Sequence, residues 1–284
     1  MADRVPSPVV GYTAIMRTAR AVLRHALTAL RGRDLALWAA GITFFAALAV
    51  VPVLLLALRG AAVLFGPELV DDGARLLGEA LPDAQRPASA VRALADAALG
   101  ASWPVLLSTL LPASLYGEGL RRGLLQIAGR PSGAKTGWLG RIGFLPVLLA
   151  APLLMAAPLA VAPSVAPGYR AGGWSAVWGV VVSFHVDWVV LSVALCLVFL
   201  ATGPNLLPRA VAVLGGFCAG AVLTGFLHGF LLFLAIPVDW AFPFAGLRAV
   251  GAVAALGLWL YLLHIILLLA YRLLLSTHAV LRDR

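Results

Sequence analysis

Residues 35–58 read LALWAAGITFFAALAVVPVLLLAL, a stretch of 24 residues without a charged side chain. A helix rises about 1.5 Å per residue, so this stretch reaches roughly 36 Å, which exceeds the hydrocarbon core of a bilayer, about 30 Å thick. Pro52 lies inside the stretch and predicts a kink. Arg59 follows at the far end, where its long side chain can reach the membrane interface. The stretch therefore predicts a transmembrane helix.

The whole chain has this apolar character, since 62% of its 284 residues are hydrophobic and 12% are charged. Soluble domains are about 45–50% apolar and about 25% charged, so a soluble fold could not cover this much apolar surface. We expect an all-α fold class, a polytopic transmembrane helix bundle within residues 35–275. The six predicted spans cover residues 35–58, 97–115, 142–162, 174–201, 209–236 and 244–271. The second span is the least apolar, with two prolines and several hydroxyl side chains.

Residues 12–33, within an N-terminal segment 1–34, have the pattern of a basic amphipathic helix. Arg17, Arg20 and Arg24 fall on one face, and apolar side chains supply the remainder. Such a helix tends to lie in the headgroup plane with its arginines toward anionic lipid. We expect an interfacial helix, with a solvated cytoplasmic helix as the alternative.

The segment 66–96 holds half of the twelve acidic residues in the chain. It predicts a soluble helical hairpin: one helix over 68–80, a break at Pro82, and a second helix opened by Pro87.

The positions of the basic residues predict the orientation in the membrane. With the N-terminus inside, the inner segments contain fifteen Lys and Arg residues and the outer segments contain five, while Arg59 completes the 21. Lys and Arg are enriched on the cytoplasmic side of membrane proteins. We therefore expect both termini, including a tail over 276–284, in the cytoplasm of a bacterial cell, and the hairpin 66–96 on the opposite side of its inner membrane.

Ionisable side chains inside a membrane are costly and are the first candidates for function. Asp187 lies near the middle of the fourth span, with Ser183 one turn earlier on the same face and His185 pointing elsewhere. This carboxylate could bind a cation, relay a proton or pair with a basic group; the alternative is a structural carboxylate satisfied by its neighbours. His228 and His264 lie in the fifth and sixth spans and could converge with Asp187, although packed histidines are the simpler interpretation.

Small residues repeat along the fifth span. Gly216 and Gly220 belong to a stripe with a four-residue period, and Gly225 and Gly229 form a second pair. Such stripes let helices approach closely, either within one chain or between copies in a homo-oligomer.

Three charged residues end the second span: Glu118, Arg121 and Arg122. The spacing allows an ion pair between the acid and either arginine, and binding of an anion or a lipid headgroup is the alternative role.

No motif indicates catalysis or a bound cofactor. The sequence has no P-loop, Gly-x-Ser-x-Gly, Cys-x-x-Cys or His-Glu-x-x-His pattern, and both cysteines, Cys196 and Cys218, lie in apolar runs. We expect neither a metal site nor a disulfide, no nucleic-acid partner and no enzyme activity.

Three segments resemble the YihY/BrkB family of inner-membrane proteins, once labelled ribonuclease BN-like. The first is 38–52, WAAGITFFAALAVVP; the second is 115–124, LYGEGLRRGL. The third combines the Pro204-Asn205 turn, Pro208 and the segment 258–262, LWLYL. The resemblance implies an integral inner-membrane protein acting in transport, envelope integrity or serum resistance. Cytoplasmic acids are too scattered for a nuclease site, so we give the ribonuclease label little weight.

Two functions remain open from the sequence. The first is a transporter or permease for an unidentified small molecule or lipid, supported by Asp187 and by spans broken by proline. The second is an envelope scaffold or assembly factor that acts through the loop 66–96. The partners we expect are the bilayer, a lipid or small-molecule substrate and, in a homo-oligomer, further copies of the chain.

Overall fold

The computed structural model describes residues 8–80, 87–234, 236 and 238–283, and the regular structure in these ranges is helical. The elements are α1 (Pro8–Leu30), α2 (Leu35–Phe65), α3 (Pro67–Ala80), α4 (Pro87–Gly100), α5 (Trp103–Ile127), α6 (Thr136–Ala171), α7 (Gly173–Leu197), the π-helical turn η2 (Val198–Thr202), α8 (Arg209–Leu234), the 3-10 turn η3 (Phe242–Phe244) and α9 (Arg248–Arg282). Among the described residues, five helices are long and apolar enough to cross a membrane: α2, α6, α7 with η2, α8 and α9. The predicted all-α membrane bundle is thus confirmed as a class.

The second predicted span is placed differently in the structure. Residues 97–100 complete α4, and α5 begins only at Trp103, where Pro104 is favourable because a proline has no N–H that would lack a partner in the first helical turn. The prediction ended the span at Leu115 and made the region from Glu118 onward a polar segment. Instead, α5 continues to Ile127, and within it Glu118 pairs with Arg122 one helical turn later.

Other helix ends also lie beyond the predicted limits of the spans. Helix α6 continues to Ala171, so the predicted outer loop 163–173 is almost entirely helical, and α9 includes most of the predicted tail 276–284. The hydrophobic pattern marks where apolar surface ends, but the hydrogen-bond ladder of a helix can continue into water. The helices α3 and α4 match the predicted hairpin, while its predicted break at Pro82 lies outside the described residues.

Two hydrophobic clusters hold the bundle together. The central cluster includes Ile42 of α2, Leu120 of α5, Phe144 of α6 and Leu268 of α9. The hairpin cluster joins α3 and α4 to α2 and α6, and in it Val70 is completely buried. Arg59 strengthens this second contact, because it donates a hydrogen bond to the Leu99 carbonyl at the end of α4, 2.8 Å away, rather than reaching an interface alone.

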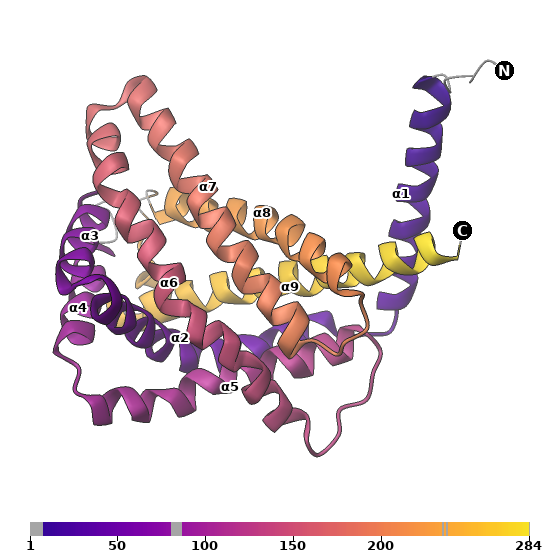
Figure 1. Cartoon of the computed structure of the whole chain (residues 1–284), viewed down its shortest axis with the longest axis horizontal. Helices are drawn as coiled ribbons and strands as arrows, with labels where there is room; N and C mark the ends of the chain where they lie inside the picture. The colour runs from indigo at the N-terminus through magenta and orange to yellow at the C-terminus, as the bar shows by residue number, and fades with distance from the viewer. Residues whose placement is uncertain (1–7, 81–86, 235, 237, 284) are drawn as a thin grey trace.

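The helices form a ring around the central cluster. Helix α2 packs against α6, which packs against α7; α8 joins α7 to α9, and α9 returns to α2, while α5 packs against α2, α6 and α9. Figure 1 shows α3 and α4 at one end of α9, and α1 near the other end, crossing the direction of α9. Helix α1 contacts the bundle through α9.

Candidate functional site

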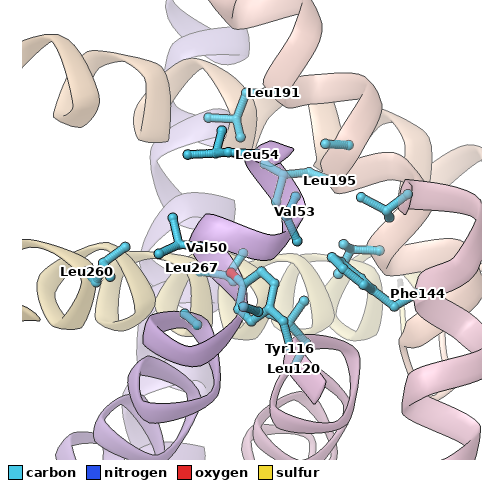
Figure 2. A pocket seen from close by; sticks show the side chains of 15 residues that line it. Val50, Val53, Leu54, Tyr116, Leu120, Phe144, Leu191, Leu195, Leu260 and Leu267 are labelled. Carbon is cyan, nitrogen blue, oxygen red and sulfur yellow. The ribbon is translucent and has the colours of Figure 1, made fainter. Parts of the chain in front are cut away.

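A cavity of about 260 Å³ lies inside the ring of helices. Its walls come from α2, α5, α6, α7, η2 and α9, and Figure 2 shows side chains such as Val53, Leu195 and Leu267 around this space. Toward the interior it ends on buried residues, among them Leu120 and Phe144, whereas rim residues of α2, α7 and α9 are partly exposed. Such a volume approaches the lower end of known ligand pockets, about 300 Å³.

The lining of the cavity is almost wholly apolar. Of its fifteen residues, fourteen are Ala, Val, Leu or Phe, and the remaining one is Tyr116 of α5. The phenolic oxygen of Tyr116 is therefore the single polar side-chain atom of the lining, drawn in red in Figure 2. The cavity suits an apolar molecule that carries at most one polar group near this oxygen.

Tyr116 is held by a buried histidine. Its hydroxyl lies 2.9 Å from Nε2 of His264 in α9, whose side chain is fully buried. The other ring nitrogen, Nδ1, lies 3.1 Å from the Thr43 hydroxyl of α2. The Tyr116 and His264 rings also meet edge to face, with their centroids 5.7 Å apart. These three residues, the polar triad, tie α2, α5 and α9 together beside the cavity.

Asp187 and His228 come together at a different place, the contact between α7 and α8. The carboxylate Oδ2 of Asp187 lies 3.7 Å from Nε2 of His228, and Nδ1 of His228 bonds to the Thr224 carbonyl one turn earlier. The Asp187 side chain is 41% exposed. Asp187 does not line the central cavity, although Leu191, one turn further along α7, does.

The other predicted members of the intramembrane polar site do not join this pair. The exposed side chain of His185 bonds through Nδ1 to the Val181 carbonyl of its own helix, 2.7 Å away. The Ser183 hydroxyl lies 2.7 Å from the Tyr169 hydroxyl of α6. His264 belongs to the polar triad. The structure therefore divides the five residues among several contacts instead of one site.

The four glycines of α8 have two different environments. A Cβ atom at Gly216 would lie 2.5 Å from Cys196 Sγ, and one at Gly220 would lie 2.2 Å from Ser192 Oγ, so both glycines bring α8 close to α7 within the chain. At Gly225 and Gly229 an added Cβ would meet nothing within 4 Å among the described atoms.

Charged residues gather around the C-terminal part of α5, at the end of the bundle opposite α3 and α4 (Figure 1), which we call the basic end: Arg33, Glu118, Arg121, Arg122, Arg141 and Arg272. Glu118, with a side chain only 12% exposed, accepts from Arg122 at 2.8 Å and from Arg141 of α6 at 2.9 Å. Burial alone would raise the pKa of Glu118, but the hydrogen bonds and charges of the two arginines outweigh burial and hold the pKa below its ordinary value.

Arginines of the basic end also bond to backbone carbonyls. Arg121 donates to the carbonyls of Thr202 and Gly203, which end the π-helical turn, at 2.9 and 3.1 Å. Arg33 donates to the Gln126 carbonyl, and Arg272 lies 3.5 Å from the Ile127 carbonyl, both at the C-terminus of α5. Cations are favourable at this end of a helix because its last carbonyls lack partners. These arginines therefore have structural partners within the chain.

Sequence reasoning missed the cavity, Thr43 and Tyr116. A neutral hydroxyl in an apolar helix carries little signal by itself, and no pattern in one sequence reports a void between helices. Thr43 and Tyr116 do, however, lie inside the segments 38–52 and 115–124, and His264 follows the segment 258–262 by two residues. Among the described residues, no group of three or more His, Cys, Asp or Glu side chains is placed to hold a metal ion.

Comparison with known proteins gives one match. A family model described as virulence factor BrkB matches residues 26–281, which include the cavity lining, the polar triad and the basic end. No match was found among curated proteins or among solved structures.

Proposed function

The chain belongs to the BrkB virulence-factor family, and from this premise we propose that it is a permease of the bacterial inner membrane for a lipid or another small apolar molecule. The molecule enters the central cavity and crosses the bilayer within the ring of helices. The observation that carries the proposal is the cavity itself, because protein interiors are otherwise close-packed. A void of about 260 Å³ forfeits packing contacts unless a ligand or lipid fills it.

Proline supports a moving ring of helices around this cavity. Pro52 lies in α2 and Pro112 in α5, both beside the cavity-lining segments, and α6 contains five prolines. Each proline inside a helix removes one backbone hydrogen bond, so these walls can bend at lower cost than regular helices.

We further propose that α5 is an additional span, which brings the total to six, with both termini in the cytoplasm. Its polar residues lower its mean hydropathy, but it packs beside α2 and α6 like the other spans. The basic end then lies in the cytoplasm, as the distribution of Lys and Arg favours.

The test is transport in proteoliposomes. A fluorescent phospholipid is placed in both leaflets, and its movement is followed by quenching from outside. Ala194→Phe directs a ring into the cavity, because Ala194 lines it. Ala47→Phe adds the same ring on α2, where Ala47 is exposed. We expect the Ala194→Phe protein to lose the flux and the Ala47→Phe protein to retain it. Equal flux in the two variants would remove the cavity from the pathway.

The same assay assigns Asp187. Because this carboxylate pairs with His228 away from the cavity lining, Asp187→Asn should leave the lipid flux within about twofold of wild type. A larger loss, with the protein still folded, would place Asp187 in the pathway and make the Asp187–His228 contact a coupling site.

A scaffold role is the second candidate, supported by the hairpin α3–α4. Its apolar side is buried against the bundle, while Asp71, Asp72, Arg75 and Arg92 form ion pairs on its exposed side. A partner would bind this polar face. Alanine at Asp72 and Arg75 should then abolish crosslinking to that partner and leave lipid flux unchanged.

A further inference from the structure

The hydrogen bonds of the polar triad fix where each hydrogen lies. His264 is fully buried, and its described hydrogen-bond partners are the hydroxyls of Thr43 and Tyr116, with no carboxylate among them. A charged imidazole in such a place would lack a counter-ion, so the ring is neutral, with one N–H donor and one acceptor nitrogen.

The donor nitrogen is Nδ1. The Thr43 hydroxyl gives its one hydrogen to the Ala39 carbonyl, 2.8 Å away. The same hydroxyl oxygen lies 3.1 Å from Nδ1 of His264, so toward this nitrogen it can only accept, and Nδ1 carries the hydrogen.

Nε2 is consequently the acceptor, and the Tyr116 hydroxyl must donate to it across 2.9 Å. The one hydrogen of Tyr116 is thereby used. What remains at the phenolic oxygen, the single polar side-chain atom of the cavity lining, is acceptor capacity. A ligand in the cavity can satisfy this oxygen only by donating a hydrogen bond.

We propose that the cavity selects an apolar chain ending in a hydroxyl group, a lipid alcohol, over chains ending in an ether or a carboxylate. An ether oxygen would face the Tyr116 oxygen without a hydrogen between them. A carboxylate would bring a charge into an apolar lining and two more acceptors. This inference rests on the proposed function, because it names the chemical class of the molecule that enters the same cavity.

The experiment measures equilibrium binding of three tritiated probes to the purified full chain in detergent: 1-decanol, decyl methyl ether and decanoate at neutral pH. The Ala194→Phe protein, with its blocked cavity, gives the background from micelles. We expect decanol to bind roughly two- to tenfold more tightly than the ether, the range for one hydrogen bond. Decanoate should stay at background.

Two variants separate the hydrogen-bond mechanism from general fit. Tyr116→Phe removes the acceptor, so decanol affinity should fall to that of the ether. His264→Leu releases the Tyr116 hydrogen, which can then be donated to the ether, so ether affinity should rise to that of decanol. Both variants remove the preference for decanol over the ether, Tyr116→Phe by lowering the decanol affinity and His264→Leu by raising the ether affinity. Thermal unfolding and size exclusion check folding, and if His264→Leu does not fold, the Tyr116→Phe result still decides.

Equal binding of decanol and ether to wild type, above the Ala194→Phe background, would overturn the selectivity and leave the proposed function standing. A wild-type preference for the ether would show that Tyr116 donates into the cavity, and would also overturn it. Binding of neither probe above background would defeat both the inference and the cavity as a transport site. A decanol preference that survives in Tyr116→Phe would move the selecting group away from Tyr116.

Discussion

Glu118 is the acid of the basic end, and two helices depend on it. Through Arg122 it pairs within α5, and through Arg141 it ties α5 to the start of α6, where Arg141 also lies 5.1 Å from the centroid of the Trp138 ring. Hydrogen bonds between charged partners contribute more than neutral ones, and a half-broken pair leaves an uncompensated charge.

Glu118→Gln should destabilise the protein by about 2 kcal/mol at neutral pH, because the charge-assisted hydrogen bonds from two arginines are weakened. Thermal unfolding of the purified protein measures this loss. The folded-state pKa of Glu118 lies below its ordinary value near 4.5, so the stabilisation is complete above that pH and is lost as the pH falls through the folded pKa. The difference between wild type and Gln should therefore shrink in acid.

Asp96→Asn is the matched control for this prediction. Asp96 is 64% exposed and lies 4.0 Å from Arg92, so its loss should change stability by less than about 0.5 kcal/mol. Equal effects of the two substitutions would show that the pairs of Glu118 contribute no more than a solvated surface pair.

Single residues also show which parts of the candidate site can be predicted from the sequence. The identity of Asp187 as an intramembrane acid is visible in the sequence, but its partner His228 lies 41 positions away and depends on how α7 and α8 face each other. The sequence does not single out Tyr116, because a tyrosine in an apolar run is ordinary. Its importance arises from a void and a buried histidine, which are properties of packing and not of spacing.

At the scale of helices, glycine sets how closely the elements approach. A Cβ at Gly140 of α6 would lie 2.5 Å from the Gly117 carbonyl oxygen of α5, and one at Gly117 would lie 2.4 Å from the Gly140 carbonyl oxygen. Backbone thus meets backbone at the crossing of α5 and α6. Neither atom can move aside as a flexible side chain could, so this contact requires both glycines.

Gly140→Ala should destabilise the protein by about 1–3 kcal/mol, the usual cost of overpacking, and lower its unfolding temperature. Gly225→Ala should be neutral or stabilising by up to about 1 kcal/mol, since its Cβ meets open space and alanine favours the helix. A destabilised Gly225→Ala protein would point to a contact between copies of the chain at that face, which crosslinking would then detect.

Helix existence was readable from the sequence, but helix ends were not. Long apolar runs predicted α2, α6, α7, α8 and α9, because a bilayer demands about twenty apolar residues. The ends of α6 and α9 lie in polar sequence, where only backbone hydrogen bonds and neighbouring helices decide the limit. The division between α4 and α5 depends on a turn at residues 101–102, inside a run that hydropathy alone joins.

On the scale of the whole molecule, the two ends of the bundle differ in charge and in the helix connections that they contain. The basic end holds the α5–α6 connection, and the opposite end holds the α4–α5 connection. Their sidedness in the membrane follows from the proposed six spans.

A pair of engineered cysteines tests this sidedness in intact cells. Gly100 and Gly133 lie in these two connections or at their edge, and an added Cβ at either meets nothing within 4 Å. In a Cys218→Ala background, which removes the exposed native cysteine, a membrane-impermeant maleimide should label Gly100→Cys but not Gly133→Cys. Permeabilised cells should label both. Labelling of Gly133→Cys alone in intact cells would reverse the orientation, and labelling of both would place the two positions on one side and reject α5 as a single span between them.

Helix α6 links the two hydrophobic clusters, with Phe144 in the central one and Leu159 in the hairpin one. Each of its five prolines removes one hydrogen bond from the helix backbone. A helix with several prolines bends more easily than a regular helix, so α6 would bend when a bound molecule widens the central cavity. The hairpin cluster packs against the C-terminal half of α6 and would move when α6 bends. Binding of a molecule in the central cavity would then change the tilt of α3 and α4 at the far surface.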